Sequence, residues 1–455
     1  MVASPFTCDF ETVGDGLERV LNTPTGLHRS RVPGRPEPGS ELSHWWHQYL
    51  KGVPPTLETA QDRVVRTAEL FCGSGGLAQG VKQACQELGY GFSSMFAIDT
   101  DPDAVDVYRH NHGTELHRCG PDKGSIKHLL EQDRVEGHGN EARFRYGTPL
   151  IADEGVAELS GEIDLLLAGP PCQGHSNLNN LTRRDDERNA LYLTVPTFAV
   201  AARIPMVIIE NVASVTKDHS GIVETAKGLF RNNDYEVDDL TLRADRFGWP
   251  QTRSRHFMVA RLKDFGRPLL PLGIVSASLT VDPEEVMDVM WAIGELEDEA
   301  EDDEMNRRPK LSQANQERIE WFDQNERETV LPRDQRPPSH KDDEKDQANQ
   351  ELLRPSVFKE RKSVYGRMKP DKPAPTLTTG FMTPGRGRFV HPTRPRMLTP
   401  KEAARIQGFP DDYVWHVPDK NRPTTSMLTK WIGDAVPMPL GHAATLSVLG
   451  PGFPT

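Results

Sequence analysis

The chain has 455 residues, a length that is enough for a large core and roughly two to three domains. Hydrophobic residues make up 36% and charged residues 27% of the sequence. The net charge of −13, taken alone, disfavours nucleic-acid binding. No apolar run approaches the roughly 18 residues of a membrane span, and the N-terminal MVASPFTCDFETVG lacks the basic flank and apolar stretch of a signal peptide. The five cysteines are scattered without a CxxC pair, which argues against a disulfide scaffold and a structural metal site and fits a cytoplasmic location.

The first 65 residues are predicted to form an N-terminal extension. Within residues 1–65, RVPGRPEPG (31–39) predicts an irregular linker because Pro and Gly dominate the segment. The segment that follows, HWWHQYL (44–50), is expected to be ordered.

From residue 66 the sequence alternates between strand and helix patterns. Short apolar runs predict strands at 66–71, 93–99, 163–169, 206–212 and 255–261. Helices are predicted at 76–89, 101–112 and about 187–203. Repeated βα units of this kind predict an α/β fold with a doubly wound parallel sheet in residues 66–265.

Hydrophobic periodicity fades after residue 265, and residues 266–394 are predicted to form a second, smaller region. Its polar segment 295–350 is interpreted either as a small separate domain or as partly mobile, with a helical piece at 312–324. A capped helix at 398–409 belongs to the last part, 395–455. This part is expected to return to the first domain and to bring its final helix beside the loop after the first strand.

Charge is spread unevenly along the chain. The stretch ELEDEAEDDE (295–304) is strongly acidic, whereas arginines gather elsewhere. A local basic face on an acidic protein is therefore open. It would draw on Arg183, Arg184, Arg188, Arg253, Arg255, Arg386, Arg388, Arg394 and Arg396.

A glycine-rich loop follows the first strand and contains Phe71, Gly73, Ser74 and Gly76. Glycines let the backbone turn sharply and approach a ligand, and the next helix offers free N–H groups to an anion such as a carboxylate. Asp99 ends the second strand, where an acidic side chain can accept hydrogen bonds from two ribose hydroxyls. From these features alone, a cofactor loop and a glycine-rich turn with a solvated aspartate are both open.

Cys172 lies in GPPCQGHS (169–176), at the end of an apolar strand, where open α/β sheets bind ligands. Two prolines stiffen the loop. Arginines that follow would lower the pKa of the thiol from its usual value of about 8.5. A cysteine buried as a small hydrophobe is the alternative, but the polar surroundings favour a nucleophile.

Six motifs together resemble those of the C5-cytosine-specific DNA methyltransferase family, and they occur in that family's order. They are LFCGSGGLAQG, GPPCQGHS, IIENV, FGWPQTRSRHF, RMLTPKEAARIQGFP and IGDAVPMPLG, within about residues 66–262 and 373–445. The resemblance implies a Rossmann-like, S-adenosylmethionine-dependent sheet with a smaller target-recognition domain. It also implies methyl transfer to carbon 5 of cytosine in double-stranded DNA.

The resemblance assigns four catalytic residues. Cys172 would attack carbon 6 of a cytosine swung out of the duplex. Glu210, at the end of strand 206–212, would donate a proton or hydrogen bond at N3; a glutamate capping a turn is the alternative. Arg255 would contact the cytosine O2. Arg253 would support the phosphate backbone or the catalytic loop, with a structural salt bridge as the alternative.

The resemblance also predicts the cofactor-binding residues, and the sequence departs from the family pattern near them. The expected set is Phe71, Gly73, Ser74, Gly76, Asp99, Thr100, Ser125, Ile126, Pro171, Leu191, Asp434 and Ala435. Ser125 stands where an Asp usually meets the adenine amino group, and Asp434 replaces an Asn near the methionine part. If Asp434 faces the ammonium or sulfonium of the cofactor, we expect it to strengthen binding, and if it faces the cofactor's carboxylate, we expect it to weaken binding; we favour the first. A third departure is His175, which replaces a Phe.

Two other functions are weighed against DNA methylation. A tRNA cytosine methyltransferase shares the catalytic domain, but its Cys-Phe-Thr signature is absent between 262 and 395. A catalytically dead DNA-binding or scaffold protein is disfavoured by the presence of Cys172, Glu210 and Arg255. By family, a restriction-modification or other phage-defence setting is expected, which allows other proteins of such a system as partners.

Overall fold

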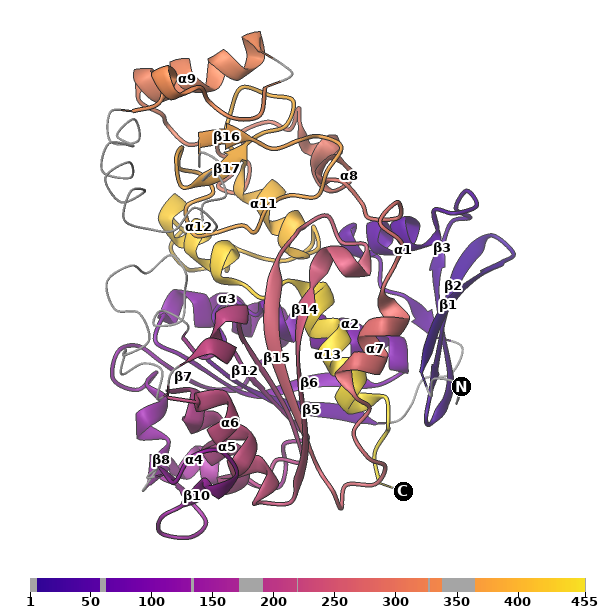
Figure 1. Ribbon diagram of the computed structural model, residues 1–455, viewed down its shortest axis with the longest axis vertical. Coiled ribbons are helices and arrows are strands. Elements are labelled where there is room, and N and C mark those ends of the chain that lie inside the picture. The colour runs from indigo at the N-terminus through magenta and orange to yellow at the C-terminus, as the bar shows by residue number, and fades with distance from the viewer. Residues whose placement is uncertain are drawn as a thin grey trace, which may run out of the picture.

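A mixed seven-stranded sheet forms the centre of the computed structural model, which describes residues 6–57, 63–131, 135–171, 191–218, 220–325, 328–337 and 365–454 (Figure 1). The strand order is β14-β15-β13-β12-β5-β6-β7. The bounds are β5 (Val64–Leu70), β6 (Gly91–Asp99), β7 (Leu116–Cys119), β12 (Leu165–Ala168), β13 (Met206–Val212), β14 (Tyr235–Arg243) and β15 (Ser254–Leu262). The predicted α/β fold is confirmed.

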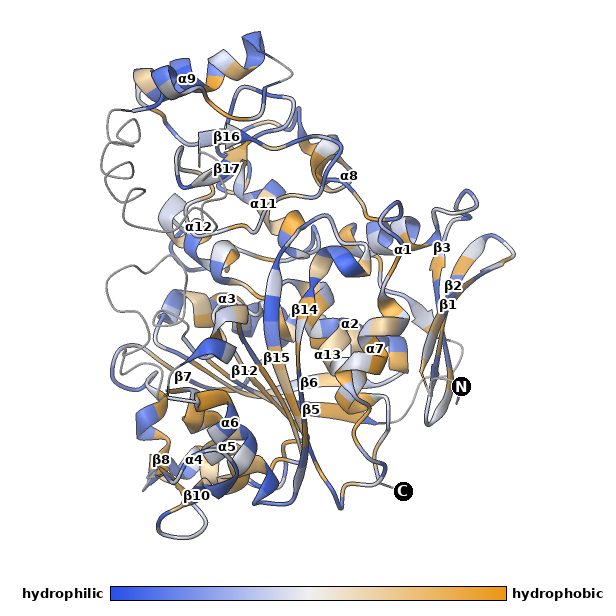
Figure 2. Ribbon diagram, in the orientation of Figure 1, coloured by the Kyte–Doolittle hydropathy of each residue, from blue (hydrophilic) through white to orange (hydrophobic). Residues whose placement is uncertain are grey.

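Alternation along the central strands explains why both faces of the sheet are covered. In β12, Leu165 and Leu167 join one buried cluster while Leu166 and Ala168 join the other. The first cluster includes residues of α2 (Gly76–Leu88), α3 (Pro102–His112), α7 (Leu272–Leu279) and α13 (Met438–Leu449); the second includes α5 (Leu191–Ala201) and α6 (Ile222–Arg231). Figure 2 shows the inner strands as largely hydrophobic ribbons.

One strand runs against the predicted parallel direction. β15 pairs antiparallel with both β13 and β14, so the prediction of a wholly parallel sheet is wrong for β15. The connection from β14 is short, and antiparallel neighbours accept short connections, whereas parallel ones need a long crossover. β14 itself was not predicted.

Several predicted helices are confirmed together with their caps. α2 ends at Gly89, whose φ of 81° is left-handed. Asp101 caps α3 by accepting a hydrogen bond from the Ala104 N–H. Thr399 and Glu402 form a capping box on α11 (Pro400–Gln407). The predicted helical piece 312–324 is α9 (Gln313–Gln324).

The N-terminal residues form an antiparallel sheet and one helix. The strands are β1 (Thr7–Val13), β2 (Gly16–Thr23), β3 (Gly26–Pro33) and β4 (Thr56–Leu57), and α1 (Glu41–Leu50) lies between the last two. The predicted linker is therefore wrong at residues 31–33. Arg19 is buried against Glu87 of α2 at 3.0 Å, which ties this sheet to the core.

The described part of the connection between β7 and β12 holds short elements. They include β8 (Leu130–Glu131), β9 (Val135–Glu136), β10 (Arg143–Phe144), β11 (Leu150–Ile151) and α4 (Glu154–Ala157). Within the described ranges, no helix is both long and apolar enough to cross a membrane.

A third core lies above the sheet in Figure 1 and belongs largely to the second region and the segment after it. Its elements are α8 (Val289–Ile293), α9, β16 (Tyr365–Arg367), β17 (Gly387–Val390), α11 and α12 (Thr425–Asp434). Residues 338–364 lie outside the described residues, and they include the end (338–350) of the segment 295–350 that was expected to be a separate domain or partly mobile.

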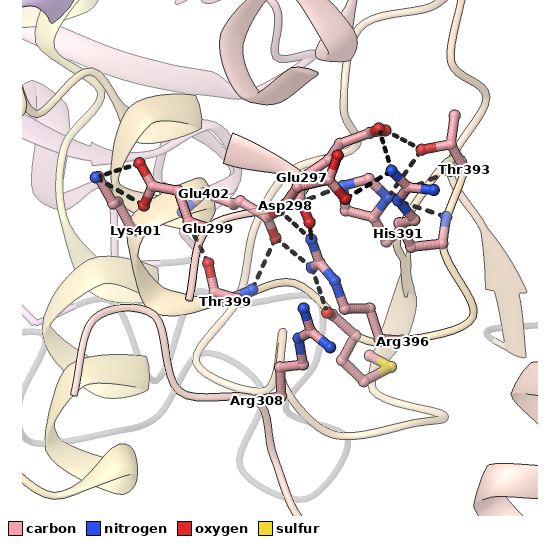
Figure 3. A network of polar contacts seen from close by, with 12 residues as sticks. Glu297, Asp298, Glu299, Arg308, His391, Thr393, Arg396, Thr399, Lys401 and Glu402 are labelled. Carbon is pink, nitrogen blue, oxygen red and sulfur yellow. Dashed lines mark hydrogen bonds and ion pairs between the residues drawn. The ribbon is translucent and has the colours of Figure 1, made fainter. Parts of the chain in front are cut away.

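The acidic stretch 295–304 is paired with basic side chains of the same chain (Figure 3). Glu299 binds Lys401 at 2.8 Å, and Asp298 binds Arg394 at 2.8 Å. Arg396 is buried and binds Glu402 at 2.7 Å. Arg396 is therefore not available for the basic face that the sequence left open, whereas Arg394 is 42% exposed and has acidic neighbours in Glu297 and Asp298.

Candidate active site

The glycine-rich loop after β5 is held by the carboxylate of Asp99. Oδ2 of Asp99 accepts a hydrogen bond from the Gly73 N–H at 2.9 Å, and Oδ1 accepts one from the Asp101 N–H at 3.0 Å. Phe71 has a φ of 59°, a left-handed value uncommon for a residue with a Cβ. Strain at such a residue marks a site that the surroundings hold in place.

The C-terminal segment packs directly on this loop. A Cβ at Gly76 would lie 2.9 Å from the Val436 carbonyl oxygen and 3.0 Å from Cβ of Ala435, so only glycine fits there. Ser74 is buried, and its Oγ lies 3.5 Å from the Trp431 carbonyl. The last helix, α13, packs against α2 itself, since a Cβ at Gly80 would lie 2.6 Å from the Met438 carbonyl oxygen and 2.7 Å from the His442 nitrogen.

The end of β6 gathers further predicted residues. Gly124 packs against the backbone carbonyl of Asp99, which brings Ser125 and the buried Ile126 to the same strand end. Thr100 follows Asp99 and is exposed. Asp99, Ser125 and Ile126 thus form one edge beside the glycine-rich loop.

Glu210 and Arg255 form an ion pair at the neighbouring strand ends. Arg255 Nε lies 2.9 Å from Glu210 Oε1, with both side chains largely buried. Burial raises the pKa of Glu210, and Arg255, Arg253 and His256 oppose that rise. A carboxyl group with a raised pKa holds a proton more readily near neutral pH, as a general acid requires.

The described residues that lead to Cys172, the expected nucleophile, lie beside Glu210. Asn211 donates from Nδ2 to the Pro170 carbonyl at 3.3 Å, and a Cβ at Gly169 would lie 3.9 Å from Glu210 Oε2. Pro171 is half-buried. Cys172, His175 and Arg183, Arg184 and Arg188 lie outside the described residues, so their predicted roles stay predictions.

Arg253 is 2% exposed. Its guanidinium donates to the carbonyls of Leu377 and Gly433, at 2.6 and 3.2 Å. The charge of Arg253 also acts on the carboxylate of Glu210.

Two predicted cofactor residues lie at the margins of the described site. Leu191 begins α5 and is half-buried. The side chain of Asp434 is 59% exposed, and its Oδ2 lies 3.5 Å from Nζ of Lys430, one turn earlier on α12. Asp434 therefore has a cationic partner within the chain.

Comparison with known proteins adds to this geometry. The family described as C-5 cytosine-specific DNA methylase matches residues 65–449. The chain belongs to this family. Type II methyltransferase M1.BsuMI of Bacillus subtilis is 35% identical over 401 residues, covering 88% of this chain and 83% of the relative.

Other relatives carry similar names. Type II methyltransferase M.AgeI of Thalassovita gelatinovora is 33% identical, covering 43% of this chain and 39% of the relative. M.DdeI of Desulfomicrobium norvegicum is 26% identical, covering 82% and 86%. The protein is an S-adenosylmethionine-dependent DNA (cytosine-5)-methyltransferase, as the resemblance implied.

The loop and the strand ends of this methyltransferase suit S-adenosylmethionine. Each Asp99 oxygen already accepts one backbone N–H and still has a lone pair for a ribose hydroxyl. The loop turns into α2 at Gly75, which has a φ of 93°. Gly73 is only half-buried, and a Cβ there would meet nothing within 4 Å, which leaves space beside the loop for a ligand.

Two residues outside the predicted set, Tyr413 and His112, support this loop. Tyr413 donates its hydroxyl hydrogen to the Ser74 carbonyl, and its oxygen lies 3.3 Å from His112 Nε2. Burial lowers the pKa of His112 to about 3, so its ring is neutral. Tyr413 lies three residues after the end of the motif RMLTPKEAARIQGFP. No local sequence pattern indicates its partners, Ser74 and His112, because they lie more than 300 positions away.

Proposed function

We propose that this methyltransferase works through a covalent adduct between the Cys172 sulfur and carbon 6 of cytosine. Carbon 5 of cytosine is a poor nucleophile, and addition of a thiolate to carbon 6 converts the ring into an enamine that can react with an electrophilic methyl group. The observation that carries this proposal is the Glu210–Arg255 pair, which lies where the chain enters the Cys172 loop.

Glu210 acts in this proposal as the acid at N3 of cytosine. A proton or hydrogen bond at N3 accepts the electron density that the thiolate adds to the ring. The raised pKa of Glu210 supports this role, because the group must hold a proton near neutral pH. Arg255 keeps the carboxyl group oriented and reaches toward O2 of the base.

The cofactor residues retain their predicted roles as a proposal. Asp99 would hold the ribose, and the loop of Phe71, Gly73, Ser74 and Gly76 would hold the methionine part; the remaining set is Thr100, Ser125, Ile126, Pro171, Leu191, Asp434 and Ala435. Bound S-adenosylmethionine supplies the methyl electrophile. After methyl transfer, loss of the C5 proton and release of the Cys172 thiolate restore the aromatic ring.

Residues 266–394 are proposed to read the target sequence, with residues 66–265 and 395–455 forming the catalytic domain and residues 1–65 an N-terminal part. The target cytosine is proposed to leave the double-stranded DNA, because its ring is out of reach inside the stack. The relatives' names, type II methyltransferase, support a restriction-modification setting, with other proteins of a defence system as partners.

The experiment first uses bisulfite sequencing of DNA from cells expressing the protein to find the methylated sequence. A duplex of that sequence with 5-fluorocytosine at the target should then form a stable adduct with the wild-type protein. Cys172→Ser should lose turnover by at least about a thousandfold and form no adduct, because an alcohol is barely ionised at neutral pH.

Cys8→Ser is the matched control, since Cys8 lies in the N-terminal sheet, and it should form the adduct normally. An adduct with Cys172→Ser, or normal turnover, would refute the covalent role.

A further inference from the structure

Three alternate residues at the start of β15 lie on one face of an extended segment. Gln251, Arg253 and Arg255 are separated by two positions each, and side chains two apart share a face. Gln251 is fully buried and Arg253 is 2% exposed. Arg255 binds Glu210, so this face begins at the reacting end of the sheet.

Arg253 connects two segments that are far apart in sequence. Its Nη1 donates to the Leu377 carbonyl at 2.6 Å and its Nη2 to the Gly433 carbonyl at 3.2 Å. Leu377 belongs to the second region, and Gly433 directly precedes Asp434 and Ala435 of the cofactor segment. A planar guanidinium holds its donors in a fixed fork, so the two carbonyls keep one relative position.

The two segments also touch directly. A Cβ at Gly433 would lie 2.5 Å from the Thr379 nitrogen, so Gly433 permits a close approach of the backbones. The segment before Leu377 is held by the residues that lead into β15, because the Thr252 N–H donates to the Ala374 carbonyl at 2.9 Å. Residues 374–379 and Gly433 therefore lie in direct contact with one another and with the segment that carries Arg253.

A second buried connection starts at Gln251 and reaches the same cofactor segment. Nε2 of Gln251 donates to Oε1 of Gln407 at 3.0 Å. Nε2 of Gln407 donates in turn to the carbonyls of Ile432 and Ala435, at 2.6 and 3.3 Å. Both connections are shielded from water, so their hydrogen bonds have no solvent competitor.

We propose that Arg253 is a positioning residue that couples DNA occupancy of the second region to binding at the cofactor site, with Gln407 as the parallel connection. DNA bound against residues 374–379 holds Gly433 in place through Arg253, and with it the adjoining Ala435 and the loop at Gly76. Binding of either ligand then strengthens binding of the other by the same factor, as linkage requires. The proposal rests on the assignment of DNA recognition to residues 266–394.

The test measures the dissociation constant of S-adenosylhomocysteine for the full chain, alone and with the duplex identified by bisulfite sequencing. The wild type should bind it at least about fivefold more tightly with duplex present. Arg253→Lys keeps the charge but loses the fork, so this ratio should fall to about 1. The KM for S-adenosylmethionine at saturating DNA should rise more than kcat falls, and duplex affinity measured alone should stay within about threefold.

Arg243→Gln is the matched control, since Arg243 is on the neighbouring strand β14 and pairs only locally with Asp245; its ratio should equal that of the wild type. If Arg253→Lys does not fold, Gln407→Met decides, and its ratio should fall below half of the wild-type value. If the variant that folds has the same ratio of S-adenosylhomocysteine dissociation constants, without and with duplex, as the wild type, the coupling is overturned and the proposed function is unaffected. Failure of the wild type to bind the duplex overturns both.

Discussion

Buried glutamates are accommodated differently in two parts of the molecule. The central sheet buries one without a cationic partner in the described part of the chain, whereas helix α11, next to the second region, buries one against cationic side chains. In β5, Glu69 is 2% exposed and has no nearby cation among its described contacts; burial raises its pKa to about 8, so it is neutral at pH 7. In α11, Glu402 is fully buried against Arg396 and His391, and its pKa is lowered to about 2.

The difference shows what each region depends on. The sheet is assembled from alternating apolar side chains that enter two buried clusters, one on each face. The second region is joined to α11 by ion pairs of the acidic stretch 295–304, including Glu295 with Arg405. We expect the two regions to respond differently to loss of a charge and to pH.

The largest expected effect comes from removing the charge of Glu402. Glu402→Gln leaves Arg396 buried without its counter-charge, which should lower the free energy of unfolding by about 3–5 kcal/mol. Glu299→Gln is the matched control in the same network; its pair with Lys401 is about one-third exposed, so it should cost less than about 1 kcal/mol. Urea unfolding followed by tryptophan fluorescence measures both, and equal losses would contradict the ionic description.

The second prediction concerns how the free energy of unfolding of Glu69→Gln, compared with that of the wild type, depends on pH. A carboxyl group whose folded pKa is raised binds a proton on folding, so its cost is absent below about pH 4.5 and grows as pH rises toward 8. The stability of Glu69→Gln relative to wild type should therefore increase on the order of 1 kcal/mol per pH unit in that window.

The contribution of Glu402 to the free energy of unfolding depends on pH in the opposite direction. Its depressed pKa contributes stability above about pH 4.5 that is lost as pH falls toward 2. Unfolding measured at a series of pH values tests both, and a pH-independent difference between Glu69→Gln and wild type would show that Glu69 is ionised in the fold.

The smallest effect is expected at Asp434, the departure from the family pattern. Its side chain is 59% exposed and lies near Lys430, so solvent and that cation weaken its field at the cofactor. Asp434→Asn should weaken S-adenosylmethionine binding by less than about threefold. Calorimetric titration decides; a tenfold change would place the carboxylate against the cofactor.

Local patterns predicted five of the seven strands of the sheet and missed β7 and β14. β13 occurs at the predicted residues 206–212, and α3 and α11 begin at the capping residues Asp101 and Thr399. Such signals succeed because apolar alternation and caps act between residues that are close in sequence. The linker at 31–33 failed because strand pairing with β2 outweighs the irregularity that Pro and Gly predict.

The sequence by itself determined the family, the chemistry and the order of the motifs, since each motif carries its residue types within a few positions. Only the tertiary structure decided that β15 runs antiparallel, that Arg396 is bound by Glu402, and that Arg253 bridges Leu377 and Gly433. These outcomes depend on contacts between distant segments. Their energies come from burial and from partners that a local pattern cannot specify.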